Sequence, residues 1–249
     1  MADTEQHQKV LEQYKNYGAK SKLLELNEND LKNYDEYSSE DAFLRYFKGR
    51  DYWGDTVIDF GGRIGEKTRK IKNVTVVEIA EDSRRYMKEH GIRHTADIEA
   101  FKNGSVDLIF ASHVLEHLSD PYEYLIKFKN KLKKGGKLIL ILPVEDHRER
   151  GPEYYDENGH MYCWNIKTIN TLLRHVGLKV RESRVSCSCG LAGIIRIVLQ
   201  KVGVKNRTIA KLNYHITTNI LGKIYTSIVM KIFPYVLFGG EIYILAEKE

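Results

Sequence analysis

Short apolar runs alternate with amphipathic stretches from residue 55 onward, and this alternation predicts strands separated by helices. Short apolar runs bounded by glycine or polar turns are typical of buried parallel strands, whereas apolar residues spaced three and four apart indicate helices. The predicted strands are 56–60, 74–79, 93–96, 106–111, 137–142, 178–185 and 241–246. Between them lie a short crossover over 66–70 and helices over 81–90, 121–133 and 165–175. This order predicts an α/β fold with a doubly wound, mostly parallel sheet and right-handed crossovers.

Residues that begin and end helices support these boundaries. Asp120 followed by Pro121 is the preferred combination of cap and first helical residue. Gly91 stands where the preceding helix should end, because glycine adopts the left-handed conformation of a helix end at little cost. The pair Gly135-Gly136 is expected to end the helix that Asp120 begins.

Residues 1–50 are polar with scattered leucine and tyrosine, and we expect them to form an N-terminal helical cap. Helices are predicted over 4–17, 28–35 and 39–47, with Ser38 or Ser39 as the N-cap of the last. The core domain should then comprise residues 51–185 and 241–249. Residues 186–240 form an insertion before the last strand.

The insertion has an unusual charge. Eight lysines and arginines and no acidic residue lie between Arg184 and Gly240, in a chain of net charge +5. A basic and apolar stretch can contact an anionic membrane surface or an anionic substrate. The simpler interpretation, which we favour, is a helical lid or a homodimer face whose lysines are solvated.

The bulk composition is that of a soluble globular protein. A hydrophobic fraction of 42% and a charged fraction of 29% allow one large α/β domain with additions. The start of the chain is polar and no apolar run reaches the length of a membrane span, so we expect a cytoplasmic protein. Cys163, Cys187 and Cys189 make no metal-ligand quartet and are expected to be reduced thiols.

The first predicted strand ends in a loop that could hold a ligand. The apolar run from Val57 reaches Asp59 and then three glycines within five residues, Gly61, Gly62 and Gly65. Glycine lets the backbone turn tightly and approach a ligand closely. In open α/β sheets, nucleotide-like ligands bind at the carboxyl ends of the strands beside such loops.

Further features follow in order at the ends of the next strands. Glu78 stands 19 residues after Asp59, where an acid accepts hydrogen bonds from ribose hydroxyls in nucleotide sites. Asp97 and Ile98 follow the third strand. The segment Ser-His-Val-Leu-Glu-His-Leu over 112–118 follows the fourth strand, and Leu-Lys-Lys-Gly-Gly over 132–136 precedes the fifth.

Together these features resemble the class I S-adenosylmethionine-dependent methyltransferases, in the small-molecule branch that carries a D-x-G-x-G-x-G loop and an L-E-H-L segment. The resemblance covers residues 53–185 and the last strand. It implies a Rossmann-like sheet of seven strands, mostly parallel, with an antiparallel last strand and helices on both faces. Strands one and four should lie side by side, and strands six and seven should form an antiparallel hairpin at the edge.

The resemblance also implies a cofactor, S-adenosylmethionine, and the residues that bind it. Carried over by position, they are Asp59, Gly61, Gly62, Gly65, Glu78, Ile79, Asp97, Ile98, Ser112 and His113. Arg63 departs from the pattern, because it replaces the middle glycine of the loop. Its side chain must turn away from the cofactor, or else contact the cofactor carboxylate or a substrate anion.

Transfer of a methyl group to a hydroxyl requires that hydroxyl to lose its proton, and histidine is suited to accept it near neutral pH. The candidate bases are His117, His160 and His113. With Glu116 these residues also have the donor types of a divalent metal site. We expect no metal, because the L-E-H-L segment is widespread in the resembling family, with its glutamate serving a structural hydrogen bond.

The sequence thus predicts a methyltransferase of a small polar acceptor, most simply O-methylation of a sugar or of a phosphorylated or nucleotide-linked metabolite. A nucleic-acid substrate is not expected, because no N-P-P-Y motif follows the fourth strand and aromatic and basic residues are not interleaved. Two alternatives stay open: methylation of a lipid or quinone at a membrane surface, and a cofactor-binding protein without catalysis.

Overall fold

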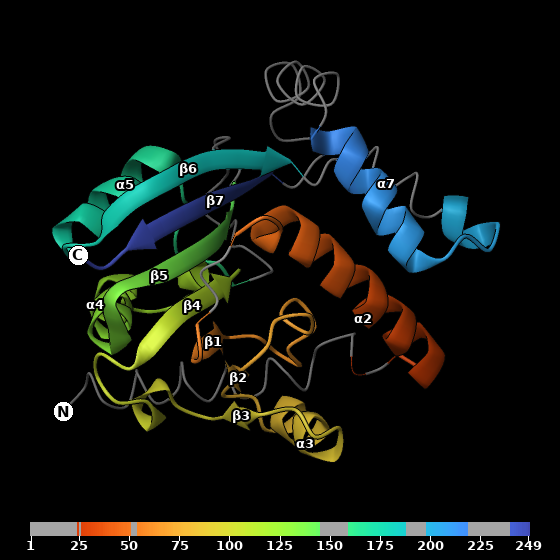
Figure 1. The fold of residues 1–249 in the computed structure, drawn as a ribbon, viewed down its shortest axis with the longest axis horizontal. Coiled ribbons are helices and arrows are strands. Elements are labelled where there is room, and N and C mark those ends of the chain that lie inside the picture. Colours follow the sequence, from red (N-terminus) through yellow and green to blue (C-terminus); the bar gives the residue numbers. More distant parts are fainter. Residues whose placement is uncertain (1–23, 25, 51–53, 145–158, 188–197, 219–239) are drawn as a thin grey trace, which may run out of the picture.

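The computed structural model describes residues 24, 26–50, 54–144, 159–187, 198–218 and 240–249. A seven-stranded sheet with the order β3-β2-β1-β4-β5-β7-β6 forms its centre (Figure 1). The strands are β1 (Val57–Phe60), β2 (Val74–Val77), β3 (His94–Thr95), β4 (Val106–Ser112), β5 (Leu132–Pro143), β6 (Lys179–Cys187) and β7 (Gly240–Glu247). Strand β1 pairs in parallel with β2 and β4, and β7 runs antiparallel to both β5 and β6. The predicted fold class is confirmed.

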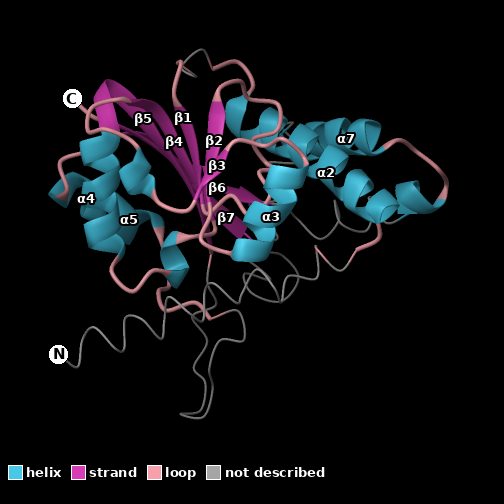
Figure 2. Cartoon of the chain, turned by 90° about the horizontal axis from the view of Figure 1, so that it is seen from below, coloured by secondary structure: helices cyan, strands magenta, loops and turns pink. Residues whose placement is uncertain are grey.

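Helices cover both faces of the sheet (Figure 2). On one face, α4 (Pro121–Lys131) and α5 (Ile166–His175) bury apolar side chains such as Phe128 and Leu173 against the strands. On the other face, the π-helix η1 (Phe43–Phe47) packs Tyr46 and Phe47 onto the strands. Each such side chain contributes about 1.5–3 kcal/mol when fully buried. The segment 43–47 therefore supplies part of the core rather than a cap alone.

Several helix boundaries match the sequence. The Asp120 carboxylate accepts a hydrogen bond from the backbone N–H of Glu123 at 2.9 Å, and Pro121 is the first residue of α4. Helix α3 (Glu81–Glu89) is followed by Gly91 in the left-handed conformation, with φ +65°. Such caps provide hydrogen bonds for backbone N–H and C=O groups that have no partner within the helix.

The predicted role of Gly135 and Gly136 is wrong. Helix α4 ends at Lys131 and β5 begins at once. The pairing with β4 then shifts, because Val106 pairs with Leu132 whereas Leu108 pairs with Lys137. At Gly136 a Cβ atom would lie 3.0 Å from the carbonyl oxygen of Val106, so the glycine serves a bulge that the periodicity does not reveal.

The N-terminal region also differs from the prediction. Helix α2 (Glu28–Ala42) is continuous and runs directly into η1, so the expected break between 35 and 39 does not occur. No glycine or proline lies between 28 and 47 to end a helix there. Asn27 is the N-cap, whereas Ser39 lies buried within the helix and donates to the carbonyl of Glu36. The helix predicted over 4–17 lies outside the described residues.

Helix α7 (Asn206–Thr218), from the insertion, lies beside α2 (Figure 1). The Asn206 amide donates to the Asn33 side chain at 3.1 Å, and the Asn213 amide donates to the Tyr37 hydroxyl at 3.0 Å. The two regions thus form one helical layer, although the proposed division into domains stays a prediction. Within the described part of the chain, no helix has both the length and the apolar character needed to cross a membrane.

Candidate functional site

The carboxyl ends of the five parallel strands, β1 to β5, meet at one edge of the sheet. Phe60, the last residue of β1, pairs with Val77 of β2 and with Ala111 of β4. The Gly61 N–H donates to the Val77 carbonyl at 2.8 Å, which starts the glycine loop beside β2. Loops that follow these strands therefore face one another, as the sequence predicts.

The glycine loop packs too closely against its neighbours for larger residues. Gly61 has φ +67°, and a Cβ atom there would lie 2.5 Å from a methyl group of Val114. A Cβ atom on Gly62 would lie 2.4 Å from the Asp59 carboxyl carbon. At Gly65 the φ is +72°. The loop is thus held between the buried Asp59 and the segment that follows β4.

Glu78 supports this loop from the end of β2. Its Oε2 accepts a hydrogen bond from the backbone N–H of Arg63, and its Oε1 accepts one from Ala80, both at 2.9 Å. Burial raises the pKa of Glu78, and these backbone donors oppose the shift. Each carboxylate oxygen has a second lone pair, so Glu78 can still accept hydrogen bonds from the hydroxyls of a ribose.

Asp59 lies beneath the loop and is 2% exposed. The Thr68 hydroxyl donates to its Oδ2 at 2.6 Å. Burial nevertheless raises the pKa of Asp59 to about 7, because the Thr68 hydrogen bond offsets only part of the desolvation.

This shift predicts a pH dependence that an asparagine should remove. The pKa of Asp59 is higher in the folded state than its ordinary 3.8, so the folded protein binds the proton more tightly and loses stability as the pH rises from about 4 to about 7. Asp59→Asn keeps the shape and does not titrate. In urea unfolding, the free energy of the variant relative to the wild type should increase across this range. A difference that does not vary with pH would contradict the assigned pKa.

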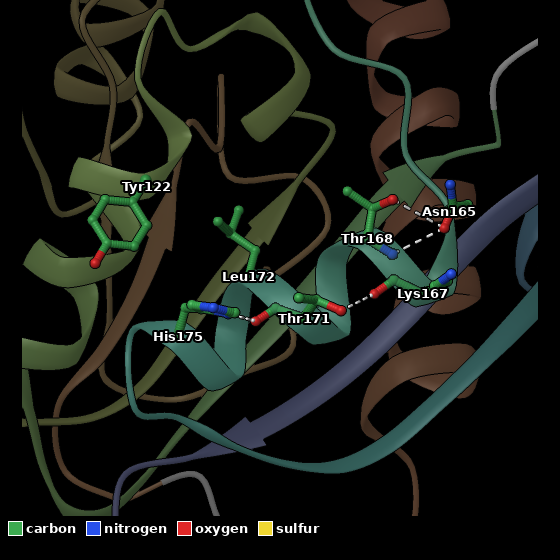
Figure 3. A pocket seen from close by; sticks show the side chains of 7 residues that line it. All are labelled: Tyr122, Asn165, Lys167, Thr168, Thr171, Leu172 and His175. Carbon is green, nitrogen blue, oxygen red and sulfur yellow. Dashed lines mark hydrogen bonds between the residues drawn. The ribbon is translucent and has the colours of Figure 1, made fainter.

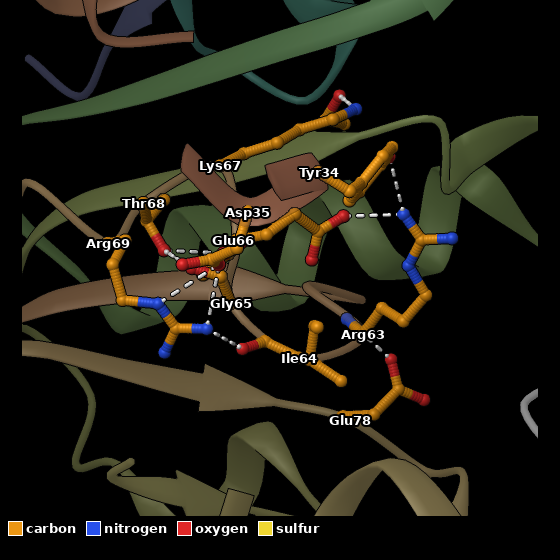
Figure 4. A network of polar contacts seen from close by, with 12 residues as sticks. Tyr34, Asp35, Arg63, Ile64, Gly65, Glu66, Lys67, Thr68, Arg69 and Glu78 are labelled. Carbon is orange, nitrogen blue, oxygen red and sulfur yellow. Dashed lines mark hydrogen bonds and ion pairs between the residues drawn. The ribbon is translucent and has the colours of Figure 1, made fainter. Parts of the chain in front are cut away.

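Arg63 turns away from the glycine loop toward helix α2 (Figure 4). Its guanidinium donates to Glu66 Oε1 at 2.5 Å and to the Tyr34 hydroxyl at 3.1 Å. The backbone of Arg63 has φ +53°, a left-handed conformation in keeping with the glycine that it replaces. A second pair, Arg69 with Asp35 at 3.0 Å, joins the same segments. Through these contacts, Arg63 links helix α2 to the glycine loop.

Arg63→Ala should destabilise the protein by about 1–2 kcal/mol, because it leaves the Glu66 carboxylate, 3% exposed, without its cation. The value is below that of a fully buried pair, since Arg63 is 35% exposed and solvent screens it. Arg85→Ala is a matched control: Arg85 forms an ion pair of the same i,i+3 spacing with Asp82 on the surface of α3. Urea unfolding should show a loss below about 0.5 kcal/mol for the control. Equal losses would show that Arg63 acts only as a surface charge.

The remaining predicted cofactor residues lie along the same edge. Asp97 is exposed and caps the short helix η2 (Ile98–Ala100) by accepting from the Glu99 N–H at 2.9 Å. Ile98 is buried in the core, and Ile79 is half-buried. Ser112, at the end of β4, accepts a hydrogen bond from the Lys67 ammonium at 2.7 Å.

His113 occupies an ionic network at the end of β4. Its Nε2 lies 3.1 Å from Glu241 Oε1, and its Nδ1 lies 3.5 Å from Glu116 Oε1. The Tyr46 hydroxyl donates to the other oxygen of Glu241 at 2.6 Å. Burial opposes charge on His113, but the two carboxylates outweigh it and raise its pKa. The pKa of Glu241 falls to about 2 although burial opposes this, chiefly because His113 contacts it.

Sequence reasoning missed Glu241, Tyr46 and Lys67. No local motif marks them, because Glu241 lies 128 positions after His113 and Tyr46 belongs to a helix that was expected to cap the core. Only the antiparallel placement of β7 beside β5 brings Glu241 to this edge.

Glu116, His117 and His160 lie together as the sequence suggested. The rings of His117 and His160 meet edge to face, with centroids 4.7 Å apart. The backbone N–H of Met161 donates to the Glu116 carbonyl at 2.8 Å and joins the two segments. Burial lowers the pKa of His117. The His113 ring adjoins the same group, since its Nδ1 lies 3.5 Å from Glu116 Oε1.

A separate pocket lies on α5 and α4 (Figure 3). It is lined by Tyr122, Asn165, Lys167, Thr168, Thr171, Leu172 and His175. None of the predicted site residues is among them. Asn165 and Thr168 form a helix cap there, and His175 contacts the carbonyl of Thr171, so these polar groups serve the helix itself.

Comparison with known proteins identifies the fold and the family. A family described as "Methyltransferase domain" matches residues 20–183. A tRNA U34 carboxymethyltransferase of Marinobacter nauticus is 36% identical over 85 residues, which are 32% of this chain and 23% of that protein. This chain thus matches less than a quarter of that relative's length.

Solved structures share the fold at low identity. Phosphoethanolamine N-methyltransferase 2 of Haemonchus contortus, in complex with phosphomonomethylethanolamine and S-adenosylhomocysteine, superposes with a TM-score of 0.54 and 16% identity, over 88% of this chain and 58% of that chain. A putative methyltransferase of Bacillus halodurans gives a TM-score of 0.54 and 17% identity, over 84% and 99%. A family match over more than half of the chain, together with this fold, places the chain among the class I S-adenosylmethionine-dependent methyltransferases.

Proposed function

We propose that this methyltransferase methylates a hydroxyl oxygen of a small polar acceptor, such as a sugar or a phosphorylated or nucleotide-linked metabolite. One observation carries the proposal: Glu116, His117 and His160 gather at the end of β4, next to the glycine loop. Val114 joins the two features, because it lies against Gly61 and precedes this group by two residues. Acceptor and cofactor sites that adjoin in this way suit a direct transfer.

The residues around the glycine loop fit the cofactor. Gly61 and Gly62 leave no room for a Cβ atom, and Glu78 retains lone pairs for ribose hydroxyls. We assign the methionine part of the cofactor to the loop above Asp59 and to Ser112, and the ribose to Glu78. When bound, S-adenosylmethionine supplies a methyl group on a positively charged sulfur, so the protein has to orient the acceptor and manage its proton.

The histidines have different roles in this proposal. His113 lies between the carboxylates of Glu116 and Glu241, which hold its ring in place. His117 and His160 supply the nitrogen atoms toward which the acceptor proton moves. The oxygen–hydrogen bond of the acceptor breaks toward this group as the oxygen gains the methyl group. A hydroxyl acceptor needs such a proton acceptor, so the two histidines favour an oxygen acceptor.

His117→Gln should lower kcat at least 100-fold, the ordinary range for loss of a proton acceptor being about 10²–10⁴. The affinity for S-adenosylmethionine in calorimetry should change less than threefold, since Glu78 and the glycine loop are untouched. His175→Gln, on α5 and away from this edge, is the control and should keep full activity. The assay follows methyl transfer from labelled cofactor to a panel of sugars, sugar phosphates, nucleotide sugars and amines. Transfer to amines alone would overturn the choice of oxygen.

The two alternatives are separable. Absence of cofactor binding at millimolar S-adenosylmethionine would favour a protein without catalysis and defeat the proposal. A lipid or quinone acceptor would require liposome binding through the basic insertion, of which residues 188–197 and 219–239 lie outside the described part of the chain. Co-sedimentation with anionic liposomes that is lost without residues 186–240 would favour that acceptor class.

A further inference from the structure

Glu116, His117 and His160 have the arrangement of a metal-binding triad. One ligand atom from each lies within 4.8 Å of the others. Glu116 and His117 belong to the short helix η3 (Leu115–His117), and His160 comes from the segment before α5. The hydrogen bond from the Met161 N–H to the Glu116 carbonyl, 2.8 Å, fixes the two segments relative to one another. The donor atoms are thus brought together by the backbone.

The Glu116 carboxylate is the observation that points to a ligand. Its side chain is 0% exposed, and neither oxygen accepts a hydrogen bond from any described residue. The His113 ring lies 3.5 Å away, beyond good hydrogen-bond distance, and is itself bonded to Glu241. A buried carboxylate costs several kcal/mol unless it is paired, hydrogen-bonded or bound to a metal. A cation between Glu116 and the two imidazoles would remove this cost.

We propose that Glu116, His117 and His160 bind one divalent transition-metal ion, such as Zn²⁺ or Mn²⁺. Imidazole nitrogens suit Zn²⁺, whereas Mg²⁺ and Ca²⁺ prefer sites made wholly of oxygen; Mn²⁺, which also favours oxygen ligands, should bind more weakly than Zn²⁺. Three protein ligands leave at least one coordination position open, as in catalytic rather than structural sites. Beyond the ligands, Glu241 contacts the His113 ring at 3.1 Å, and that ring borders the Glu116 carboxylate at 3.5 Å.

The open position gives the metal a role in the proposed function. An acceptor hydroxyl bound there becomes more acidic and is fixed in orientation, so its proton leaves more easily. With a metal bound, His117 and His160 would serve as its ligands in place of accepting the proton themselves, and the acceptor proton would pass to solvent. This role rests on the proposed methylation of a hydroxyl, whereas binding of the metal itself does not.

The test uses the full chain after treatment with a chelator and dialysis. Zn²⁺ and Mn²⁺ are titrated by calorimetry, and Co²⁺ is titrated by its visible absorption bands. We expect one ion per chain with a Kd in the micromolar range or below. His160→Ala should weaken binding at least tenfold, since it removes one of three ligands. His94→Ala, a half-buried histidine of β3, should bind as the wild type does.

Glu116→Gln serves as a second variant of nearly equal size, and circular dichroism confirms that each variant is folded. Wild-type protein that binds none of the three ions, or binds them no better than His160→Ala, overturns the proposal. Should Glu116→Gln fail to fold, His160→Ala alone still tests metal binding.

Methyl-transfer activity is measured separately. Full methyl transfer in excess chelator would refute the metal's role and leave the proposed function standing, whereas tight metal binding without any methyl transfer would refute the proposed function only.

Discussion

Gly61→Ala is expected to destabilise the protein by about 3 kcal/mol and to weaken S-adenosylmethionine binding at least tenfold. Two costs add at this position. The left-handed backbone, φ +67°, costs about 1–2 kcal/mol for a residue with a Cβ atom. The new Cβ would lie 2.5 and 3.1 Å from the two methyl groups of Val114, and overpacking of this kind costs about 1–3 kcal/mol. Relief requires the loop to move, which disturbs the cofactor site.

Gly104→Ala separates these two costs. Gly104 has the same φ, +67°, and no atom lies within 4 Å of the Cβ that alanine would add. We expect a loss of about 1 kcal/mol and unchanged cofactor affinity. Urea unfolding and calorimetry measure both quantities. If Gly61→Ala costs no more than Gly104→Ala, the contact with Val114 does not restrict the loop.

Glu241→Gln should lower the unfolding free energy by about 2 kcal/mol and kcat at least tenfold. Removing one partner of a buried ion pair costs about 3–5 kcal/mol. We expect less here because His113 is 34% exposed. The glutamine cannot hold the His113 ring as a carboxylate does, so His113 loses its fixed place beside Glu116. Because the effect on turnover arises through position, the affinity for S-adenosylmethionine should change little.

Glu247→Gln is the matched control on the same strand. Glu247 pairs with Lys137 and Arg181 near the surface, away from the carboxyl edge. Its loss should cost less than about 1 kcal/mol and leave kcat unchanged. Tyr46→Phe removes only the hydroxyl that contacts Glu241 and should fall between the two. Equal kcat values for Glu241→Gln and Glu247→Gln would remove Glu241 from the site.

Much of the fold follows from local chemistry. The apolar runs of β1 and β4 are buried on both faces, and the cap at Asp120 needs only its own neighbours. The predicted element boundaries were wrong where tertiary contacts determine the structure. The continuous helix through Ser39 is stabilised by packing of its last turns on the sheet, and the early start of β5 depends on a bulge against Val106. Neither contact produces a periodic pattern of apolar residues in the sequence.

The candidate site likewise combines residues that the sequence predicts with residues that only the tertiary structure reveals. Sequence motifs indicated Glu78, His117 and His160, because these residues lie in or beside short motifs that follow one another in a recognisable order along the chain. They could not mark Glu241, which reaches His113 only through strand pairing. The motif also could not say where the Arg63 side chain turns, since its partner Tyr34 lies on a separate helix. Roles for all these residues stay predictions until the variants are measured.

The position of β7 has a consequence for biosynthesis. A ribosome delivers β5 and β6 before the strand that separates them in the finished sheet. Until residues 240–247 emerge, both strands present unpaired hydrogen-bonding edges that invite association with other chains. Pairing over such a sequence separation is also slow. We therefore expect the pairing of β7 with β5 and β6, and with it the contact of Glu241 with His113, to form last in the core. Newly made chains should depend on chaperones until then.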